Sequence, residues 1–186
     1  MPHPSSHEIK KWYVAYTYPK AERKVKTKLD TIGIQSFLPM HQVVRAWSDR
    51  NKKLTIPLFP NYIFIHISET KRHETFLIKE IIRYVSFEGK PATVHDATID
   101  SLKKILNNKV EIDVENYIKE GTRVKINRGP FTGIEGIVAE RNGKTRLIIH
   151  IKALQRSVAI NISAGDVEPP QHNFQFSSSN PISGQR

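Results

Sequence analysis

The sequence predicts an α+β fold in two parts: an antiparallel or mixed sheet with helices packed on it, followed by a small β-barrel. Residues 8–110 mix apolar side chains at helical spacing with runs that alternate as in a strand. Residues 119–169 hold only short Val/Ile-rich runs separated by glycine and polar turns, as in small barrels. Between them, residues 111–118 contain three acids and no base, which we interpret as a linker. Residues 170–186 are polar and serine-rich, a composition typical of disorder.

The order of elements in the first part follows from local patterns. Lys11–Thr17 is aromatic and β-branched, so we expect a strand that ends before Pro19. Apolar residues at helical spacing then predict a helix over Lys20–Ile32, which Gly33 ends. Further strands are expected at Ser36–Trp47, Leu54–Leu58, Asn61–Ile67 and Tyr84–Phe87, and further helices at Thr70–Glu80 and Thr98–Leu106.

The second part is predicted to consist of strands alone. The pair Asn142-Gly143 is a strong signal for a two-residue hairpin turn. The expected strands are Thr122–Ile126, Glu135–Glu140, Arg146–Lys152 and Ser157–Ile162. Several short strands within so few residues favour a closed barrel.

Composition excludes several classes of function. The chain has no cysteine, which excludes disulfides, thiolate catalysis and cysteine-ligated zinc. We expect a cytoplasmic protein without a membrane segment, because neither a signal peptide nor a sufficiently long apolar run is visible. The histidines lack metal-ligand spacing, and Val138 stands where a phosphate-binding loop would need its first glycine. No catalytic residue, metal or cofactor is therefore predicted, and we expect a protein that is not an enzyme.

Basic residues of the first helix form a candidate nucleic-acid surface. The formal net charge of the chain is +11, which favours a polyanionic partner. Lys20, Lys24 and Lys28 recur at every fourth position and so form one stripe, which Arg23 broadens. Such a stripe is also typical of an ordinary solvated helix face. Both interpretations remain open from the sequence.

A second basic group lies at the tip of the expected hairpin, residues 45–53. Arg45, Arg50, Lys52 and Lys53 gather there around a single acid, Asp49, and Trp47 is available to stack. Two basic elements in one small domain favour contact with nucleic acid.

The strand Asn61–Ile67 has two different apolar faces. Alternation places three isoleucines on one face, which we expect in the core, and Tyr62 and Phe64 on the other. Phe59 precedes this aromatic face, and Tyr16 of the first strand could extend it. Helices covering both faces would explain the pattern; an exposed patch that receives a partner's helices would explain it equally well.

Two groups of motifs resemble the NusG family over about residues 9–168. Residues 11–14 (KWYV), followed by Glu22 and a basic helix, and residues 57–64 (PLFPNYIF) resemble its N-terminal domain. Residues 124–136, with the run GPFTGIEG, resemble its KOW motif. Residues 57–64 resemble the RfaH-type members especially. Residues 37–39 (FLP), 47–50 (WSDR) and 85–89 (VSFEG) resemble the UpxY-type antiterminators of polysaccharide operons more closely still.

The resemblance implies a four-stranded NGN-type domain and a five-stranded SH3-like KOW barrel. It also implies a monomeric elongation or antitermination factor that binds the clamp helices of the largest RNA polymerase subunit and contacts non-template or upstream DNA. The aromatic residues that would contact the clamp helices are Tyr16, Phe59, Tyr62, Phe64 and Phe87. The basic residues that would contact DNA are Lys20, Arg23, Lys24, Lys28, Arg50, Lys52 and Lys53.

The KOW motif implies a further contact. Phe131 of its loop would bind a ribosomal or termination-factor partner. Glycines at 129, 133 and 136 favour a stable barrel over a helical alternative, because glycine costs about 1 kcal/mol relative to alanine in a helix. Residues 71–74 (KRHE) depart from the His-Thr-Thr element of RfaH, so the resemblance does not define a contact there.

Three functional alternatives remain beside a factor specific to polysaccharide operons. A general NusG-type factor differs in acting at most genes, and only the basic first helix argues against it. A ribosome-associated KOW protein would be basic too, but would not need the aromatic face. An enzyme that modifies nucleic acid is disfavoured by the lack of a catalytic cluster.

Overall fold

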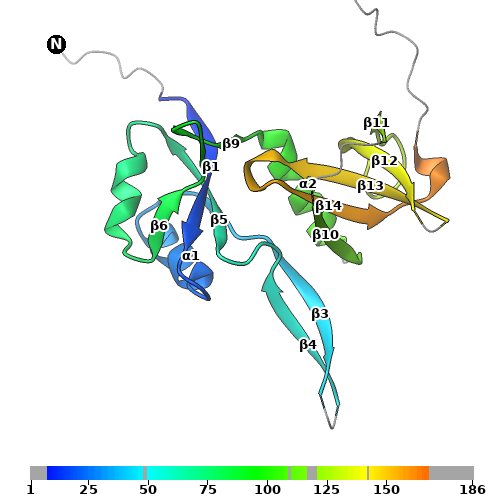
Figure 1. Cartoon of the computed structure of the whole chain (residues 1–186), viewed down its shortest axis with the longest axis horizontal. Coiled ribbons are helices and arrows are strands. Elements are labelled where there is room, and N and C mark those ends of the chain that lie inside the picture. The colour runs from blue at the N-terminus through cyan, green and yellow to red at the C-terminus, as the bar shows by residue number, and fades with distance from the viewer. Residues whose placement is uncertain (1–7, 48–49, 109, 117–120, 142, 168–186) are drawn as a thin grey trace, which may run out of the picture.

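The computed structural model describes residues 8–47, 50–108, 110–116, 121–141 and 143–167, which form two antiparallel sheets joined through helix α2 (Figure 1). The first sheet has the order β2-β5-β1-β6, with β9 also paired to β1. Its strands are β1 (Lys10–Thr17), β2 (Ser36–Phe37), β5 (Tyr62–Ser68), β6 (Ile81–Tyr84) and β9 (Thr93–Val94). The helices of this part are α1 (Glu22–Thr31), the 3₁₀ helix η1 (Arg72–Leu77) and α2 (Asp96–Asn107).

Two hairpins stand outside the first sheet. The longer one joins β3 (Met40–Ala46) to β4 (Asn51–Pro57) and projects away from both sheets (Figure 1). The shorter one joins β7 (Ser86–Phe87) to β8 (Lys90–Pro91).

The second sheet has five strands in the order β10-β14-β13-β12-β11. They are β10 (Ile112–Asn116), β11 (Thr122–Lys125), β12 (Glu135–Arg141), β13 (Lys144–Ile151) and β14 (Arg156–Asn161), with short 3₁₀ helices η2 (Lys152–Leu154) and η3 (Ala164–Asp166). Strands β12 and β13 pair as far as Arg141 and Lys144, which confirms the predicted hairpin.

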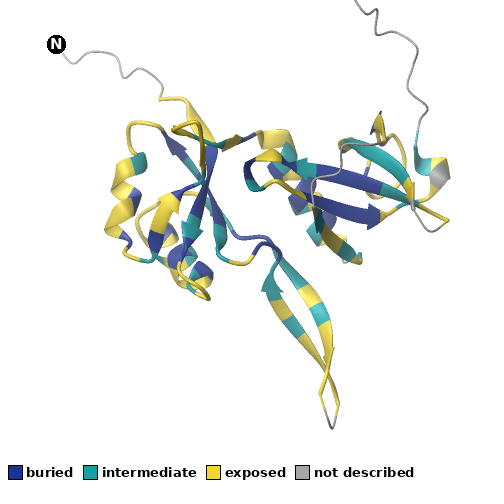
Figure 2. Ribbon diagram, in the orientation of Figure 1, coloured by how far each residue is buried: buried dark blue, intermediate teal, exposed yellow. Residues whose placement is uncertain are grey.

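The two faces of the first sheet pack in two separate clusters. Ile63, Ile65 and Ile67 lie in the cluster that holds Val25 and Leu29 of α1, as the sequence predicted. The opposite face contributes Trp12, Val14 and Phe64 to a larger cluster. That cluster continues through Ile99, Leu102 and Ile105 of α2 into Val124, Leu147 and Ile149 of the second sheet. Figure 2 shows the central strands of both sheets as buried.

Four expectations about local structure were wrong. The helix expected at 70–80 is the shorter 3₁₀ helix η1, and the strand expected at 84–87 is divided between β6 and β7. The first sheet has five strands rather than four, because β9 pairs with β1. Its described pairings are all antiparallel, one of the two arrangements that the sequence left open.

The expected linker is the fourth correction. Residues 112–116 form β10, which pairs with β14 from Ile112↔Ile160 onward. Their alternating apolar and acidic side chains fit an edge strand, and Arg146 of β13 makes ion pairs with both Asp113 and Glu115. Residues 117–118 and the expected tail at 170–186 lie outside the described residues.

Candidate functional site

The aromatic face of the first sheet is built by the register of β1 against β5. Tyr16 lies opposite Tyr62, and Val14 lies opposite Phe64. Cross-strand neighbours share a face, so the two tyrosine rings meet with centroids 5.2 Å apart. The guanidinium of Arg83 lies 5.5 Å from the Tyr16 ring. Both tyrosines are half-buried and therefore open to a partner.

The phenylalanines of the same face are buried. Phe64 is 0% exposed and Phe59 is 3% exposed. The Phe64 ring contacts Phe59 edge-on at 6.1 Å and Phe37 at 6.0 Å. Helix α2 covers this group, because its Lys103 ammonium lies 5.6 Å from the Trp12 ring and 5.9 Å from the Phe37 ring. The exposed part of the expected patch is thus the Tyr16–Tyr62 pair.

The remaining aromatic candidates lie elsewhere. Phe87 in β7 is exposed, and no ring contact described here joins it to the Tyr16–Tyr62 pair. Phe131 is buried in the cluster that α2 shares with the second sheet. Its neighbour Thr132 offers a carbonyl oxygen that accepts a hydrogen bond from the Lys104 ammonium of α2. The structure therefore does not bring all five predicted clamp-helix residues together.

A buried carboxylate fixes the loop before β5. Asn61 has a left-handed backbone (φ 70°), and its amide donates to the Glu22 carboxylate at 2.7 Å. Glu22 is buried at the start of α1. Asparagine tolerates this conformation better than most residues. This link ties α1 to the strand that presents Tyr62, a structural role that the sequence motif alone did not reveal.

The predicted basic stripe of α1 is partly neutralised by Glu80. The Lys24 ammonium lies 2.8 Å and the Lys28 ammonium 2.7 Å from its carboxylate oxygens. Hydrogen bonds from these two lysines hold the pKa of Glu80 at about 2, below its ordinary value. The sequence contained no local signal for this pairing, since Glu80 is far from α1 along the chain.

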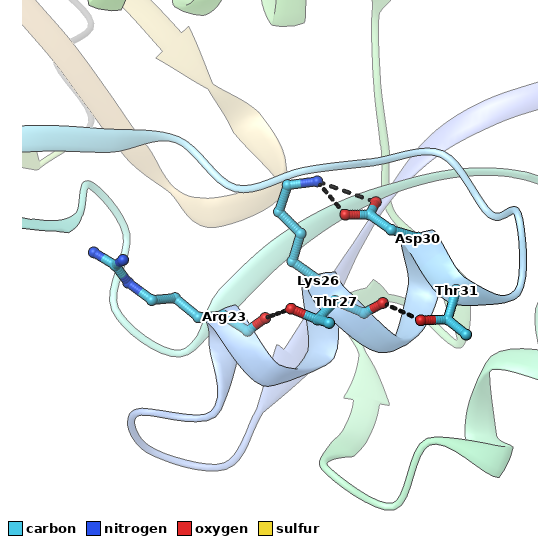
Figure 3. A network of polar contacts seen from close by, with 5 residues as sticks. All are labelled: Arg23, Lys26, Thr27, Asp30 and Thr31. Carbon is cyan, nitrogen blue, oxygen red and sulfur yellow. Dashed lines mark hydrogen bonds and ion pairs between the residues drawn. The ribbon is translucent and has the colours of Figure 1, made fainter.

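Other polar groups of α1 bond within the helix (Figure 3). Lys26 and Asp30 form an ion pair at 2.9 Å, and Thr27 and Thr31 each donate to the carbonyl one turn earlier. The Arg23 side chain points away from this network, and its guanidinium donates to the Thr55 carbonyl of β4 at 2.8 Å.

Lys20 sits at the entrance to α1 with a left-handed backbone (φ 61°). Together with Arg23, Pro57 and Asn61 it lines a shallow depression between α1 and the end of β4. Of the four predicted DNA contacts on this helix, Lys20 and Arg23 thus share a concave surface, while Lys24 and Lys28 are held by Glu80.

The structure separates the basic residues of the β3–β4 hairpin. Lys52 lies opposite Arg45, whereas Lys53 lies opposite Val44 on the other face of the hairpin. The Lys52 ammonium lies 5.0 Å from the centroid of the Trp47 ring. Arg50 is exposed at the start of the returning strand. The three predicted contacts therefore cannot all face one ligand surface.

The described residues hold no cluster of His, Asp and Glu suited to a metal ion. None of their helices is long and apolar enough to cross a bilayer.

A family model described as "Transcription termination factor nusG" matches residues 10–103. The chain belongs to the NusG family. This confirms the resemblance of the chain to the NusG family.

Curated relatives match over nearly their whole length. The transcription termination/antitermination protein NusG of Pseudomonas aeruginosa is 25% identical over 174 residues, 86% of this chain and 98% of that protein. The protein of the same name from Escherichia coli K12 is 24% identical over 177 residues, 86% of this chain and 96% of that protein. A solved structure titled "Domain interaction in Thermotoga maritima NusG" is 24% identical and covers 87% of this chain and 98% of its own, with a TM-score of 0.44.

Proposed function

We propose that the chain is a cytoplasmic, monomeric transcription elongation and antitermination factor that acts by binding RNA polymerase. The observation that supports this most is the Tyr16–Tyr62 pair, which lies half-exposed on the part of the chain that matches the family model. Aromatic anchors of this kind supply much of the binding energy at protein interfaces. The clamp helices of the largest subunit are the proposed partner.

The proposed factor acts as an adaptor: it binds its partners and catalyses no reaction. Contact between the tyrosine pair and two polymerase helices supplies affinity. Phe59 and Phe64 belong to the buried cluster against which Tyr62 packs. Basic residues of α1 and the β3–β4 hairpin add contact with non-template or upstream DNA. If the factor binds the processive state of polymerase more tightly than the paused state, it shifts the population toward elongation.

The second sheet is proposed to be a KOW domain with an SH3-like barrel. Phe131 would be its contact for the ribosome or a termination factor. Because Phe131 is buried in the cluster shared with α2, that contact requires the second sheet to move away from α2. Phe87 is left as a separate, exposed contact for polymerase.

Binding to polymerase tests the proposal. Immobilised core polymerase should retain the wild-type chain and release a Tyr62→Ala variant. The matched control is Ile82→Ala, which truncates an exposed apolar residue of the same sheet. Equal retention of both variants would remove the clamp-helix assignment, and retention on ribosomes alone would favour a ribosome-associated protein.

Specialisation is a separate question. The motifs shared with UpxY- and RfaH-type members favour action at particular operons, such as those for polysaccharide synthesis. Chromatin immunoprecipitation beside polymerase tests this. Signal confined to a few operons supports a specialised antiterminator, whereas signal that follows polymerase over most genes identifies a general factor.

A further inference from the structure

The tip of the β3–β4 hairpin presents a cationic and aromatic face. Arg45 and Lys52 are cross-strand partners and therefore share one face. The Trp47 amide donates to the Arg50 carbonyl at 2.8 Å, which extends the same register by one pair. Alternation then places Trp47 and Arg50 on the face of Arg45 and Lys52. The contact between Lys52 and the Trp47 ring agrees with this placement.

The same face changes character along the hairpin. Near its base it carries the half-buried Val43 and Leu54, paired across the strands. Toward the tip it carries Trp47, which is 54% exposed. The outer half of the hairpin stands clear of both sheets and is exposed (Figure 2). Packing within the chain therefore explains the base of this face but not its tip.

We propose that this tip binds single-stranded DNA, with an unpaired base stacked on the Trp47 ring and Arg45, Arg50 and Lys52 beside the flanking phosphates. The inference rests on the proposed function, in which the hairpin contacts non-template or upstream DNA. A base–aromatic stack combined with cations along the backbone is the general chemistry of single-strand recognition. Duplex DNA offers its base edges but not the face of a base, so it cannot make the stack.

Lys52 contributes in two ways. Its ammonium lies 5.0 Å from the ring centroid, which restrains the indole in an orientation that leaves it more than half exposed. It also places a positive charge beside the ring, where the phosphate next to a stacked base would lie. Lys53 points to the opposite face with the exposed Val44, so it gives a control with the same change of charge.

Tryptophan fluorescence of the full-length chain provides the test. The chain has two tryptophans. Trp12 is 4% exposed, so quenching by an oligonucleotide reports on Trp47. We expect a short oligothymidylate to quench the emission and an abasic strand of equal length to leave it unchanged. A duplex of equal length should bind more weakly and quench little.

Variants separate stacking from charge. Trp47→Ala should weaken binding of oligothymidylate about tenfold and leave binding of the abasic strand unchanged, while Trp47→Phe retains most of the affinity. Lys52→Gln should weaken binding more than Lys53→Gln. These side chains are exposed, and a circular dichroism spectrum checks that each variant is folded.

Several results would overturn the inference. These are an equal effect of Trp47→Ala on base-bearing and abasic strands, no quenching by oligothymidylate, and tighter binding of duplex or of oligouridylate. The experiment needs no polymerase, so the two proposals fail separately. Loss of polymerase binding in Tyr62→Ala with intact quenching supports both, whereas a chain that stacks bases but never binds polymerase contradicts only the proposed function.

Discussion

Truncation of Phe64 should mainly lower the stability of the fold, whereas truncation of Tyr62 should mainly weaken binding to polymerase. The two residues are nevertheless neighbours on one strand face. Phe64 is 0% exposed and packs against Phe37 and Phe59 with ring centroids 6.0 and 6.1 Å away. Phe64→Ala therefore removes a fully buried ring and leaves a cavity, which costs about 3–5 kcal/mol of unfolding free energy. That is a large part of the roughly 5–15 kcal/mol that stabilises a typical domain.

Tyr62→Ala should lower the free energy of unfolding much less than Phe64→Ala does, and its main effect should be weaker binding to polymerase. The Tyr62 ring is half-buried and its main described ring contact is with Tyr16. We expect a loss of about 1 kcal/mol in unfolding free energy. If the tyrosine pair is a binding hot spot, the same change weakens polymerase binding by about 2 kcal/mol or more.

Urea unfolding followed by circular dichroism, together with a polymerase binding isotherm, measures both quantities. Ile82→Ala is the control for truncation of an exposed apolar side chain. A loss of less than about 1 kcal/mol in Phe64→Ala would show that Phe64 is not packed as described. Normal polymerase binding by a folded Tyr62→Ala variant would refute the clamp-helix assignment.

Three further predictions concern charged side chains. Glu80→Gln removes the ion-pair partner of Lys24 and Lys28, so the affinity of the chain for single-stranded DNA should rise. The salt dependence of that affinity should steepen by about one phosphate contact. An unchanged salt slope in a binding titration would contradict this. Because the folded pKa of Glu80, about 2, lies below its ordinary value of 4.5, the stability it contributes is present above pH 4.5 and is lost as the pH falls toward 2. The difference in Tm between wild type and Glu80→Gln should therefore vanish across that window, and a constant difference would argue against the pairing. Arg146→Gln breaks the ion pairs with Asp113 and Glu115 and should cost about 2 kcal/mol in urea unfolding; no loss would mean that β10 does not depend on them.

The parts of the fold that the sequence predicted are those set by local periodicity. Alternation in β5 separated three isoleucines from Tyr62 and Phe64, and the structure places the two groups in different clusters. The helical spacing of Val25 and Leu29 likewise predicted the buried side of α1. Such patterns depend on which side of one element meets a core, and that information is local.

In strand β10, the acidic composition led to a wrong prediction although the residues alternate as in a strand. The run at 111–115 alternates acidic and apolar residues, which is the pattern of a half-buried strand, yet its lack of bases suggested a linker. The acids are compatible with a strand because Arg146, distant in sequence, pairs with both of them. A pairing of that kind is decided by tertiary structure, and no local signal predicts it.

The same limit applies to the candidate site. The sequence identified the basic stripe of α1 but not Glu80, whose carboxylate binds two of its lysines. It identified Trp47, Arg50, Lys52 and Lys53 but not their division between two faces, because the register of β3 against β4 depends on where the turn lies. Sequence thus suggested the residue types, and the register selected which of them act together.

The buried positions of Phe64 and Phe131 have a thermodynamic consequence. The two residues belong to one hydrophobic cluster, Phe64 from the first sheet and Phe131 from the second, with α2 between them. A partner that needs Phe131 exposed must separate the second sheet from α2, so part of its binding energy offsets the loss of that packing. Moving the second sheet away leaves α2 on the first sheet, where its Lys103 ammonium lies over the Trp12 and Phe37 rings, so Phe64 stays covered. The proposed polymerase contact is the half-exposed Tyr16–Tyr62 pair, which does not require that separation. On this argument, polymerase binding by the first sheet does not by itself expose Phe131, and a partner of the second sheet must offset the cost of the separation alone.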